Sequence, residues 1–549
     1  MMNERRSGLM RTQIQSVGIV NSRNLPKANI CLTLFLPFLF LMVSLGGCVS
    51  LRSDLPRDAS QAIADVDGTI LGRVYTAQAA ENPGMSGFQI IDSGQAAFMA
   101  RAALADTAER TLDLQYYSVG DDLTTNLLLL RVIAAAERGV RVRILLDDIY
   151  APTRVFAWRA MAAHRGIQVR LFNPFFFGGT VGVARLGEFI VDGERLNRRM
   201  HNKLWVTDNV VALVGSRNLG DEYFDAKESG NFYDVDLLAA GPIVKDVSRA
   251  FDAYWNSAAV IPMEAIAGAP DAADGDLARE ALRTRTAVCQ GTPPCRWLNE
   301  GGLVDALRIG GVSLSWASAQ FIYDQPDQDK ALVASGIVHG AIDDHPSGMR
   351  TQNELLIVSP YFVPSEDGRR HLAEMQARGV RIAVLTNSLA STDVPAAHAG
   401  YARHRTELLR SGVELYEVRP EPGQPHLRSH RWKHASSSSL HAKIIVQDRK
   451  RVIVGSLNQD PRSQLHNTEA WIVIDSTVIA ADLAALFEEG TDLQHAFKLG
   501  RSVTSGTETL EWITDEGVGA TRYDMEPMTS FWLRLWQDFL GVLVPEHLL

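Results

Sequence analysis

Apolar and polar positions along the chain follow one order twice. In the first half, an alternating strand (TLDLQYY, 111–117) precedes an apolar helix that ends at Gly139, and two more strands follow. Residues 354–420 show the same succession of strand, helix, strand and strand, and Gly379 lies 240 residues after Gly139. Strands that alternate with helices are typical of a largely parallel sheet with helices on its faces. We therefore predict an α/β protein of two repeats, each an α/β/α sandwich with mostly parallel sheets, related by a pseudo-twofold axis.

A pattern of fixed residues also occurs twice. It reads H-x-K-x4-D-x6-G-S-x-N, and each fixed position recurs 240 residues later. The copies consist of His201, Lys203, Asp208, Gly215, Ser216 and Asn218, and of His441, Lys443, Asp448, Gly455, Ser456 and Asn458. In the first copy, two strand-like runs meet at Asp208-Asn209, a pair typical of tight turns. We predict a hairpin in each copy, with its His and Lys on one face because residues two apart on a strand point the same way. Ser216 and Asn218 are expected at the same end of the hairpin as His201.

These residue types suit chemistry on a phosphodiester, which is anionic and a poor electrophile. Lys203 and Lys443 can neutralise the phosphoryl oxygens as negative charge develops on them. One imidazole can attack phosphorus while the other protonates the departing oxygen. A single H-x-K on a strand would indicate only a surface pair, but two copies with matched G-S-x-N ends indicate one shared site.

A nucleophilic imidazole needs a hydrogen-bond acceptor on its other nitrogen. Each half has one acid that opens an apolar, strand-like run: Asp234 in DVDLLAAGPIV and Glu469 in EAWIVIDSTVI. We expect these carboxylates to orient the two imidazoles. Asp236 is the competing choice in the first half, and an ordinary acid at the start of a strand is the alternative explanation of Asp234.

The overall charge narrows the class of partner. The chain has 549 residues, a formal net charge of −10 and a pI of about 5.8, and it is long enough for more than one domain. Proteins that bind nucleic acid generally carry a basic surface, so nucleic acid is not an expected partner. Arg195, Arg198 and Arg199, just before His201, are either contacts for a lipid phosphate or a solvated basic patch.

The amino-terminal segment has the composition of an export signal. Five basic residues within 1–29 precede an uncharged apolar run, 30–45, which ends in Leu45-Gly46-Gly47-Cys48. This ending resembles a bacterial lipobox, in which Cys48 becomes the lipidated first residue. An uncleaved membrane anchor is the alternative, since residues 30–47 nearly suffice to span a bilayer. Both interpretations place the body of the protein beside a membrane, on the exported side.

Two further cysteines, Cys289 and Cys295, flank the turn-rich sequence QGTPP. In an oxidising compartment they are expected to form a local disulfide, with two reduced thiols as the alternative. The predicted organisation is a lipoprotein-type signal peptide (1–47), a linker (48–85), a first domain (86–258), a connector (259–345), a second domain (346–500) and an apolar tail (501–549). The connector has no counterpart in the first half and serves either to roof the site or to bridge the domains.

The end of the tail is rich in apolar and aromatic residues. A helix over 530–549 would carry five of them along one side: Trp532, Leu535, Trp536, Phe539 and Leu543. This pattern indicates contact with a membrane interface or packing against the body, and periodicity alone does not separate the two.

The duplicated H-x-K-x4-D-x6-G-S-x-N pattern is the hallmark of the phospholipase D superfamily. Segments such as LDLQYY, ERLNRRMHNK, GSRNLGDEYF, LTNSLASTDVPAAHAGYARHR and GSLNQDPRS further resemble a bacterial cardiolipin synthase of the short type, without multiple transmembrane helices. The resemblance runs from about residue 88 to the carboxyl end. It implies a phosphatidyltransferase that uses no metal or organic cofactor, with phospholipids, among them phosphatidylglycerol, as substrates. The export segment departs from this family pattern.

The resemblance also implies the roles of the residues. His201 would attack the phosphodiester, and His441 would protonate the leaving headgroup and later deprotonate the acceptor hydroxyl. Ser216, Asn218, Ser456 and Asn458 would support the substrate or the catalytic residues. A phospholipase D hydrolase that releases phosphatidic acid would use the same residues, as would a periplasmic nuclease. A non-catalytic lipoprotein scaffold is disfavoured because both copies keep their His, Lys and Asn.

Overall fold

The structure is a computed structural model that describes residues 57–149, 155–175, 182–269, 271–327, 350–420, 439–504, 507–517 and 519–546. The predicted signal peptide (1–47) and Cys48 lie outside these residues. Within the described residues, no helix combines the length and apolar character needed to cross a bilayer.

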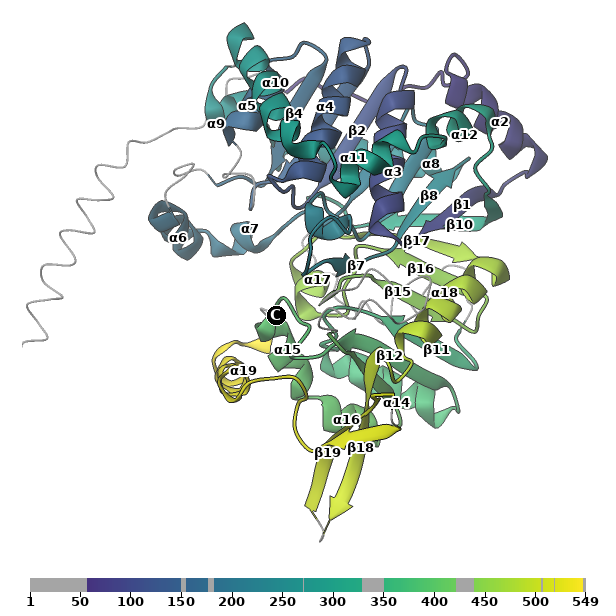
Figure 1. Ribbon diagram of the computed structural model, residues 1–549, viewed down its shortest axis with the longest axis vertical. Helices are drawn as coiled ribbons and strands as arrows, with labels where there is room; N and C mark the ends of the chain where they lie inside the picture. The colour runs from purple at the N-terminus through teal and green to yellow at the C-terminus, as the bar shows by residue number, and fades with distance from the viewer. Residues whose placement is uncertain are drawn as a thin grey trace, which may run out of the picture. The chain divides into compact units, whose positions relative to one another are not determined.

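The first repeat follows the predicted order of strands and helices (Figure 1). Its elements are β1 (Ser86–Ile91), α3 (Gly94–Thr107), β2 (Thr111–Tyr116), α4 (Leu123–Glu137), β3 (Arg141–Asp147), α5 (Val155–Ala162), β4 (Ile167–Phe172), α6 (Gly182–Val191), α7 (Gly193–Asn197), β5 (Leu204–Thr207), β6 (Val211–Gly215), η2 (Asp221–Tyr223), β7 (Phe232–Tyr233), β8 (Asp236–Ala240) and α8 (Ile243–Trp255). Asp122 caps the start of α4 by accepting from the backbone N–H of Thr125, and Gly139 follows its end with a φ of 96°.

The second repeat has the same succession. Its elements are β11 (Glu354–Val358), α14 (Glu366–Ala377), β12 (Arg381–Asn387), α15 (Pro395–Ala402), α16 (Arg405–Arg410), β13 (Glu414–Val418), β14 (Ser439–Leu440), β15 (Ile444–Gln447), β16 (Arg451–Gly455), α17 (Pro461–Leu465), β17 (Ala470–Asp475), α18 (Thr477–Gly490) and β18 (Ala496–Thr504). Ser365 caps α14, and Gly379 after its end has a φ of 89°. The two α/β repeats predicted from the sequence are therefore confirmed.

The prediction of mostly parallel sheets is wrong. Among the described strands of the large sheet, the parallel ladders are β2–β3–β4 in the first repeat and β11–β12–β13 in the second. The hairpins β5–β6 and β15–β16 lie antiparallel beside β2 and β11, and β8 and β17 continue them antiparallel. The hairpin strands are part of the same sheet as the βα units, so the described strands form a mixed and mainly antiparallel system.

Three apolar layers hold the sheets. One lies between the first sheet and the helices α3 and α4, and another between the second sheet and the elements around α14 and α16. The middle layer joins the repeats, because it contains residues from β5, β6 and α8 together with residues from β15, β16 and α18. This shared core supports the predicted pseudo-twofold packing.

The connector bridges the repeats. It contains β9 (Val260–Pro262), α9 (Met263–Ala267), α10 (Ala272–Thr286), η3 (Ala287–Cys289), α11 (Pro293–Asn299), α12 (Leu303–Ile309) and β10 (Ser315–Tyr323). Helix α10 packs on α4 and α5. Strand β10 pairs with β1 through Ser315–Ala317 and with β17 through Ser318–Tyr323, so one strand joins both sheets.

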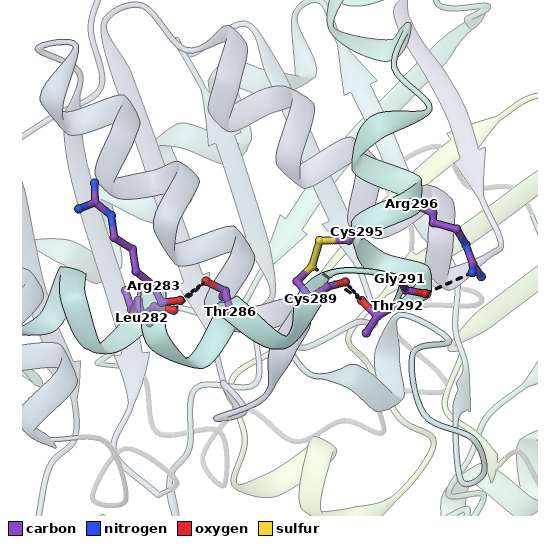
Figure 2. Close-up of a disulfide and its surroundings, with 8 residues drawn as sticks. All are labelled: Leu282, Arg283, Thr286, Cys289, Gly291, Thr292, Cys295 and Arg296. Carbon is purple, nitrogen blue, oxygen red and sulfur yellow. Dashed lines mark hydrogen bonds between the residues drawn. A yellow bond between two sulfur atoms is a disulfide. The ribbon is translucent and has the colours of Figure 1, made fainter.

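Cys289 and Cys295 form a disulfide in this connector, with their Cα atoms 5.6 Å apart (Figure 2). Thr292 lies in the loop that the disulfide closes, and its hydroxyl donates to the carbonyl oxygen of Cys289 at 2.7 Å. The disulfide therefore joins η3 to α11, beside the outer helices of the first repeat.

Two other segments differ from the sequence prediction. The predicted linker 48–85 contains helix α2 (Ile70–Glu81), whose Leu71 and Tyr75 are buried in the first-repeat core, so this part belongs to the folded body. Few large residues make up the apolar side of α2, so its hydrophobic periodicity in the sequence is weak. The tail adds β19 (Thr507–Asp515) and β20 (Ala520–Tyr523) to β18, then helix α19 (Phe531–Leu543).

Candidate active site

The two H-x-K segments begin matching hairpins. Their turns use left-handed backbone at Asp208 and Asn209 (φ 53° and 55°) and at Asp448 and Arg449 (φ 50° and 52°), which confirms the predicted two-residue turns. At the opposite end, the Nζ atom of Lys203 donates to the carbonyl oxygen of His201 at 2.5 Å, and Lys443 does the same to His441. Each ammonium group thus lies beside its own histidine.

Each histidine is held by the acid of the other repeat. The Nδ1 atom of His201 lies 2.9 Å from Glu469, and Nδ1 of His441 lies 2.9 Å from Asp234. The backbone also bonds between the repeats. The N–H of His201 donates to the carbonyl oxygen of Thr468, and the N–H of His441 donates to that of Tyr233. Short parallel pairings just before each histidine, Met200 with Thr468 and Leu440 with Tyr233, set this register. The site is therefore formed jointly by both repeats, as the sequence pattern indicated, but the pattern did not reveal that each acid serves the histidine of the other repeat.

The serines of the pattern hold the carboxylates. The Ser216 hydroxyl donates to Asp234, and the Ser456 hydroxyl donates to Glu469. A further serine, Ser463 on α17, donates to the second oxygen of Glu469 at 2.8 Å. Ser216 was expected near His201. The carboxylate to which its hydroxyl donates is that of Asp234, which is hydrogen-bonded to His441.

The glycines of the pattern allow this close approach. A Cβ atom at Gly215 would lie 2.1 Å from Asp236, and one at Gly455 would lie 2.3 Å from the carbonyl oxygen of Ala470. Any side chain there would push the hairpin away from the strand that carries the acid.

The asparagines differ between the repeats. Asn218 donates to the Tyr223 hydroxyl at 3.0 Å and accepts from the N–H of Ser118. Asn458 is 5% exposed, and its Oδ1 atom has no hydrogen-bond partner within the described part of the chain. Asn458 therefore keeps hydrogen-bonding capacity that a substrate can use.

Asp208 and Asp448, predicted as catalytic, lie at the far end of their hairpins from the histidines. The Asp208 carboxylate accepts from the N–H groups of Glu109, Arg110 and Thr111 at the start of β2. Asp448 accepts in the same way from residues 352–354. They fix the hairpin turns to the neighbouring strand, and the structure does not bring them to the imidazoles.

Other predicted candidates also have structural partners. Asp236, the competing acid, forms ion pairs with Arg101 at 2.9 Å and Arg217 at 3.5 Å, away from both histidines. Of the three arginines before His201, Arg199 is fully buried and pairs with Asp147, and Arg195 pairs with Glu188. These two arginines hold the chain that leads to His201, so they do not form the lipid-phosphate contact or the solvated patch weighed from the sequence.

Burial and the concentration of positive charge alter the protonation of the site. Burial, with the charges of Lys203 and Lys443, lowers the pKa of His201 well below its ordinary 6.5. Burial likewise lowers the pKa of His441, although Asp234 opposes the shift. Burial lowers the pKa of Lys443 to about 8 and that of Lys203 well below 10.5. Burial alone would raise the pKa of Asp234, but His441 and Lys443 hold it below its usual range.

Aromatic rings complete the walls of the site. Tyr117 meets the His201 ring edge to face at a centroid distance of 5.1 Å, and Lys203 lies 5.5 Å from the same tyrosine ring. On the other side, Tyr223 and Phe232 lie 5.4 and 5.2 Å from the His441 ring. The sequence reasoning missed these three residues. Tyr117 is the last residue of the predicted strand 111–117, which was the available indication, since functional groups often lie where strands end and loops begin.

Among the described residues, no group of three or more His, Cys, Asp or Glu side chains is arranged to hold a metal ion. The charged groups that face the imidazoles are instead the two lysines and the two cross-paired acids. Phosphate oxygens in this space would meet ammonium groups on both sides.

Comparisons with known proteins agree with this geometry. Residues 102–255 and 349–490 match the family model described as "Cardiolipin synthase, PLD-like domain". Cardiolipin synthase C of Escherichia coli (strain K12) is 38% identical over 476 residues, which cover 85% of this chain and 97% of the relative. An uncharacterized protein of Helicobacter pylori is 28% identical over 94% of this chain and 99% of its own length.

A solved structure shares the fold. The phosphatidylserine synthase of Haemophilus influenzae Rd KW20 matches with a TM-score of 0.50 at 14% identity, over 77% of this chain and 91% of that chain. At this identity the likeness concerns the fold alone.

Proposed function

Because the chain belongs to the phospholipase D-like family of cardiolipin synthases, we propose that it transfers a phosphatidyl group between phospholipids through a phospho-histidine. Phosphatidylglycerol is the expected acceptor. The observation that carries the proposal is the pair of imidazoles held by cross-paired acids, each beside a buried ammonium group. The extent of the match to cardiolipin synthase C, over 97% of that relative, supports the lipid substrate.

In the first step, the Nε2 lone pair of His201 attacks phosphorus and the bond from phosphorus to the headgroup oxygen breaks. Glu469 accepts from Nδ1 of His201, which leaves the neutral ring with its lone pair on Nε2. The lowered pKa of His201 favours this neutral form. Lys203 and Lys443 compensate the negative charge on the phosphoryl oxygens.

His441 acts as the acid of the first step and the base of the second. Its Nε2–H gives a proton to the leaving oxygen, while Asp234 stabilises the charge on the ring through Nδ1. An anionic phosphodiester in the site raises the pKa of this imidazole, which opposes the lowering by burial. The acceptor hydroxyl then gives its proton to His441, its oxygen bonds to phosphorus, and the bond to His201 breaks.

Product analysis tests the transfer. The full chain would be purified in detergent, reconstituted with phosphatidylglycerol and phosphatidylethanolamine, and its lipid products measured by mass spectrometry. We expect cardiolipin from the wild type and none from His201→Ala, with His164→Ala as a histidine control outside the site. Phosphatidic acid as the sole product would replace the transferase with a hydrolase. Turnover of DNA without lipid products would contradict the lipid substrate.

The membrane location is a second part of the proposal. We propose that the protein is exported, that residues 1–47 are removed, and that the acylated Cys48 holds the protein at a membrane. The basic and then apolar composition of residues 1–47 supports export, and a disulfide in the connector suits an oxidising compartment. Intact-mass measurement of protein from membranes tests this. An unmodified amino terminus that retains residues 1–47 would instead support the uncleaved anchor.

A further inference from the structure

Helix α19 turns its apolar side outward. Leu533 and Leu540 are half-buried, but seven of its large apolar residues are 48% or more exposed: Phe531, Trp532, Leu535, Trp536, Phe539, Val542 and Leu543. At 3.6 residues per turn, these seven positions fall within an arc of about 140° on the helix. Four of them are aromatic. A helix at the surface of a soluble body ordinarily presents the opposite arrangement.

The inward side of α19 is attached by polar contacts. Gln537 is 6% exposed, and Arg534 donates to the carbonyl oxygen and hydroxyl of Thr529 at 2.9 Å. Arg403, just after α15, donates to the carbonyl oxygens of Gly541 and Val544. The helix is therefore held on α15 in one orientation, and that orientation exposes the apolar arc.

A second apolar surface belongs to the first repeat. The end of α6 exposes Phe189 (45%), Ile190 (77%) and Val191 (86%). Partly buried ion pairs hold α6, Arg185 with Asp148 just after β3 and Glu188 with Arg195 on α7. In Figure 1, α6 and α19 project toward the same side of the molecule, one from each repeat.

Both surfaces border the active site. The chain from α6 continues through α7 directly into His201. On the other side, Asp393 lies just before α15 and accepts from the Tyr361 hydroxyl at 2.9 Å, and its negative charge raises the pKa of Lys443 against the lowering by burial. The segment that follows α6 and the residues just before α15, on which α19 packs, thus lead to the first-repeat and second-repeat sides of the site.

We propose that α19 and the end of α6 form a docking face for a phospholipid bilayer, which holds the active site at the depth of the headgroups. This inference rests on the proposed lipid substrate, because only then must the site reach molecules embedded in a membrane. Tryptophan and phenylalanine are the side chains that favour the membrane interface. The chain carries a net charge of −10 and Arg534 is hydrogen-bonded to Thr529, so the proposed contact relies on apolar burial rather than on attraction to anionic lipids.

The amino-terminal segment is compatible with this placement. The apolar run 30–45 precedes the first described residue, Arg57, whose guanidinium donates to Ala258 near the end of α8. Nine residues separate Cys48 from Arg57, a reach of about 30 Å when extended. A membrane attachment at Cys48 would keep the body close enough for the docking face to bind as an intramolecular second contact.

A ratio of two activities tests the docking face. The full chain would be assayed on long-chain phosphatidylglycerol in vesicles and on dihexanoyl-phosphatidylglycerol below its micelle concentration. For Trp532→Ser/Trp536→Ser, we expect kcat/KM on vesicles to fall at least tenfold while the value on the dissolved lipid stays within twofold. The matched control is Val288→Ser/Ile309→Ser, which changes two exposed apolar residues on the connector and should leave the ratio unaltered. An unchanged ratio in the α19 variant would overturn the proposal.

Tryptophan fluorescence tests the same face without turnover. Vesicles of bromine-substituted phosphatidylcholine should quench part of the emission, and Trp532→Phe/Trp536→Phe should remove that part, at low and at 0.5 M salt alike. Because the amino-terminal segment is present in both proteins, the difference reports α19 alone. Equal quenching of both proteins would overturn the docking face, as would emission that responds to protein concentration rather than lipid, which indicates a second copy as the occupant. If wild type is quenched as expected but turns over neither lipid, the proposed reaction fails and the docking face stands.

Discussion

The two halves of the active site carry the same reacting groups but surround them differently. His201 faces Glu469, whose carboxylate also receives two serine hydroxyls, from Ser456 and Ser463. His441 faces the shorter Asp234, which receives one, from Ser216. One tyrosine flanks His201, whereas Tyr223 and Phe232 flank His441. Duplication thus supplies two equal imidazoles, and the unequal surroundings allow them separate roles.

Removing either imidazole should have the largest effect. His201→Ala and His441→Ala should each lower kcat by about 10³-fold or more, because each removes a nucleophile or a general acid. A donor lipid whose leaving group needs no protonation distinguishes the roles of the two histidines. With it, His441→Ala should accumulate phosphoryl-enzyme on His201, seen by peptide mass spectrometry. Accumulation on His441 in the His201→Ala variant would reverse the roles.

Substituting Glu469 or Asp234 should affect the two steps of the reaction differently. Glu469→Gln and Asp234→Asn should each lower kcat by about 10²-fold to 10⁴-fold, since an amide no longer stabilises the correct tautomer or charge of the ring. Because the acids are exchanged between repeats, Glu469→Gln should slow phosphoryl-enzyme formation even with a good leaving group, whereas Asp234→Asn should not. Single-turnover quench experiments measure this. Equal slowing in both variants would contradict the assigned pairing of roles.

We expect activity to decline at alkaline pH, because the lysines of the site are buried. Burial lowers the pKa of Lys443 to about 8, so its charge is present below that pH and is lost as the pH rises through it. Since the charge binds the phosphodiester, kcat/KM should fall above about pH 8 rather than near 10.5. In Lys443→Arg, whose guanidinium stays charged, the decline assigned to this position should disappear. A flat profile to pH 10 in wild type would refute the shift.

The turn aspartates should affect stability more than chemistry. Asp208 is fully buried, and Asp448 is half-buried with the same backbone contacts. Removing the acceptor leaves N–H groups unpaired, so we expect a loss of about 3 kcal/mol for Asp208→Ala and about 1 kcal/mol for Asp448→Ala. Urea unfolding measures both. Asp→Asn at each position keeps one acceptor oxygen and should cost less. A large loss of kcat in a fully folded Asp208→Asn protein would restore a catalytic role.

Local patterns predicted much of the fold. The alternating run 111–117 forms β2 (Thr111–Tyr116), and the succession predicted from residue 354 begins with β11 (Glu354–Val358). The glycines that end the predicted helices have the positive φ that such positions require. The pair Asp208-Asn209 is a hairpin turn in the first repeat, and Asp448-Arg449 repeats it. Such features depend on neighbours within a few residues, so the sequence contains them in readable form.

The hydrophobic pattern did not predict features that depend on residues far apart in the chain. Alternation of strands and helices suggested parallel sheets, but it does not tell whether a hairpin joins the same sheet, as β5–β6 does beside β2. The outward face of α19 has the same periodicity as an inward one, and only the burial of Gln537 and the exposure of the apolar residues distinguish them.

By itself, the sequence determined that two hairpins each present a histidine and a lysine, and that two acids are available to them. Only the tertiary structure decided that Glu469 serves His201 and Asp234 serves His441. The physical reason is that hydrogen bonding of a side chain depends on which surfaces meet, and these partners are separated by 268 and 207 residues. The short pairings of Met200 with Thr468 and Leu440 with Tyr233 make that choice, and they form only when the repeats pack together.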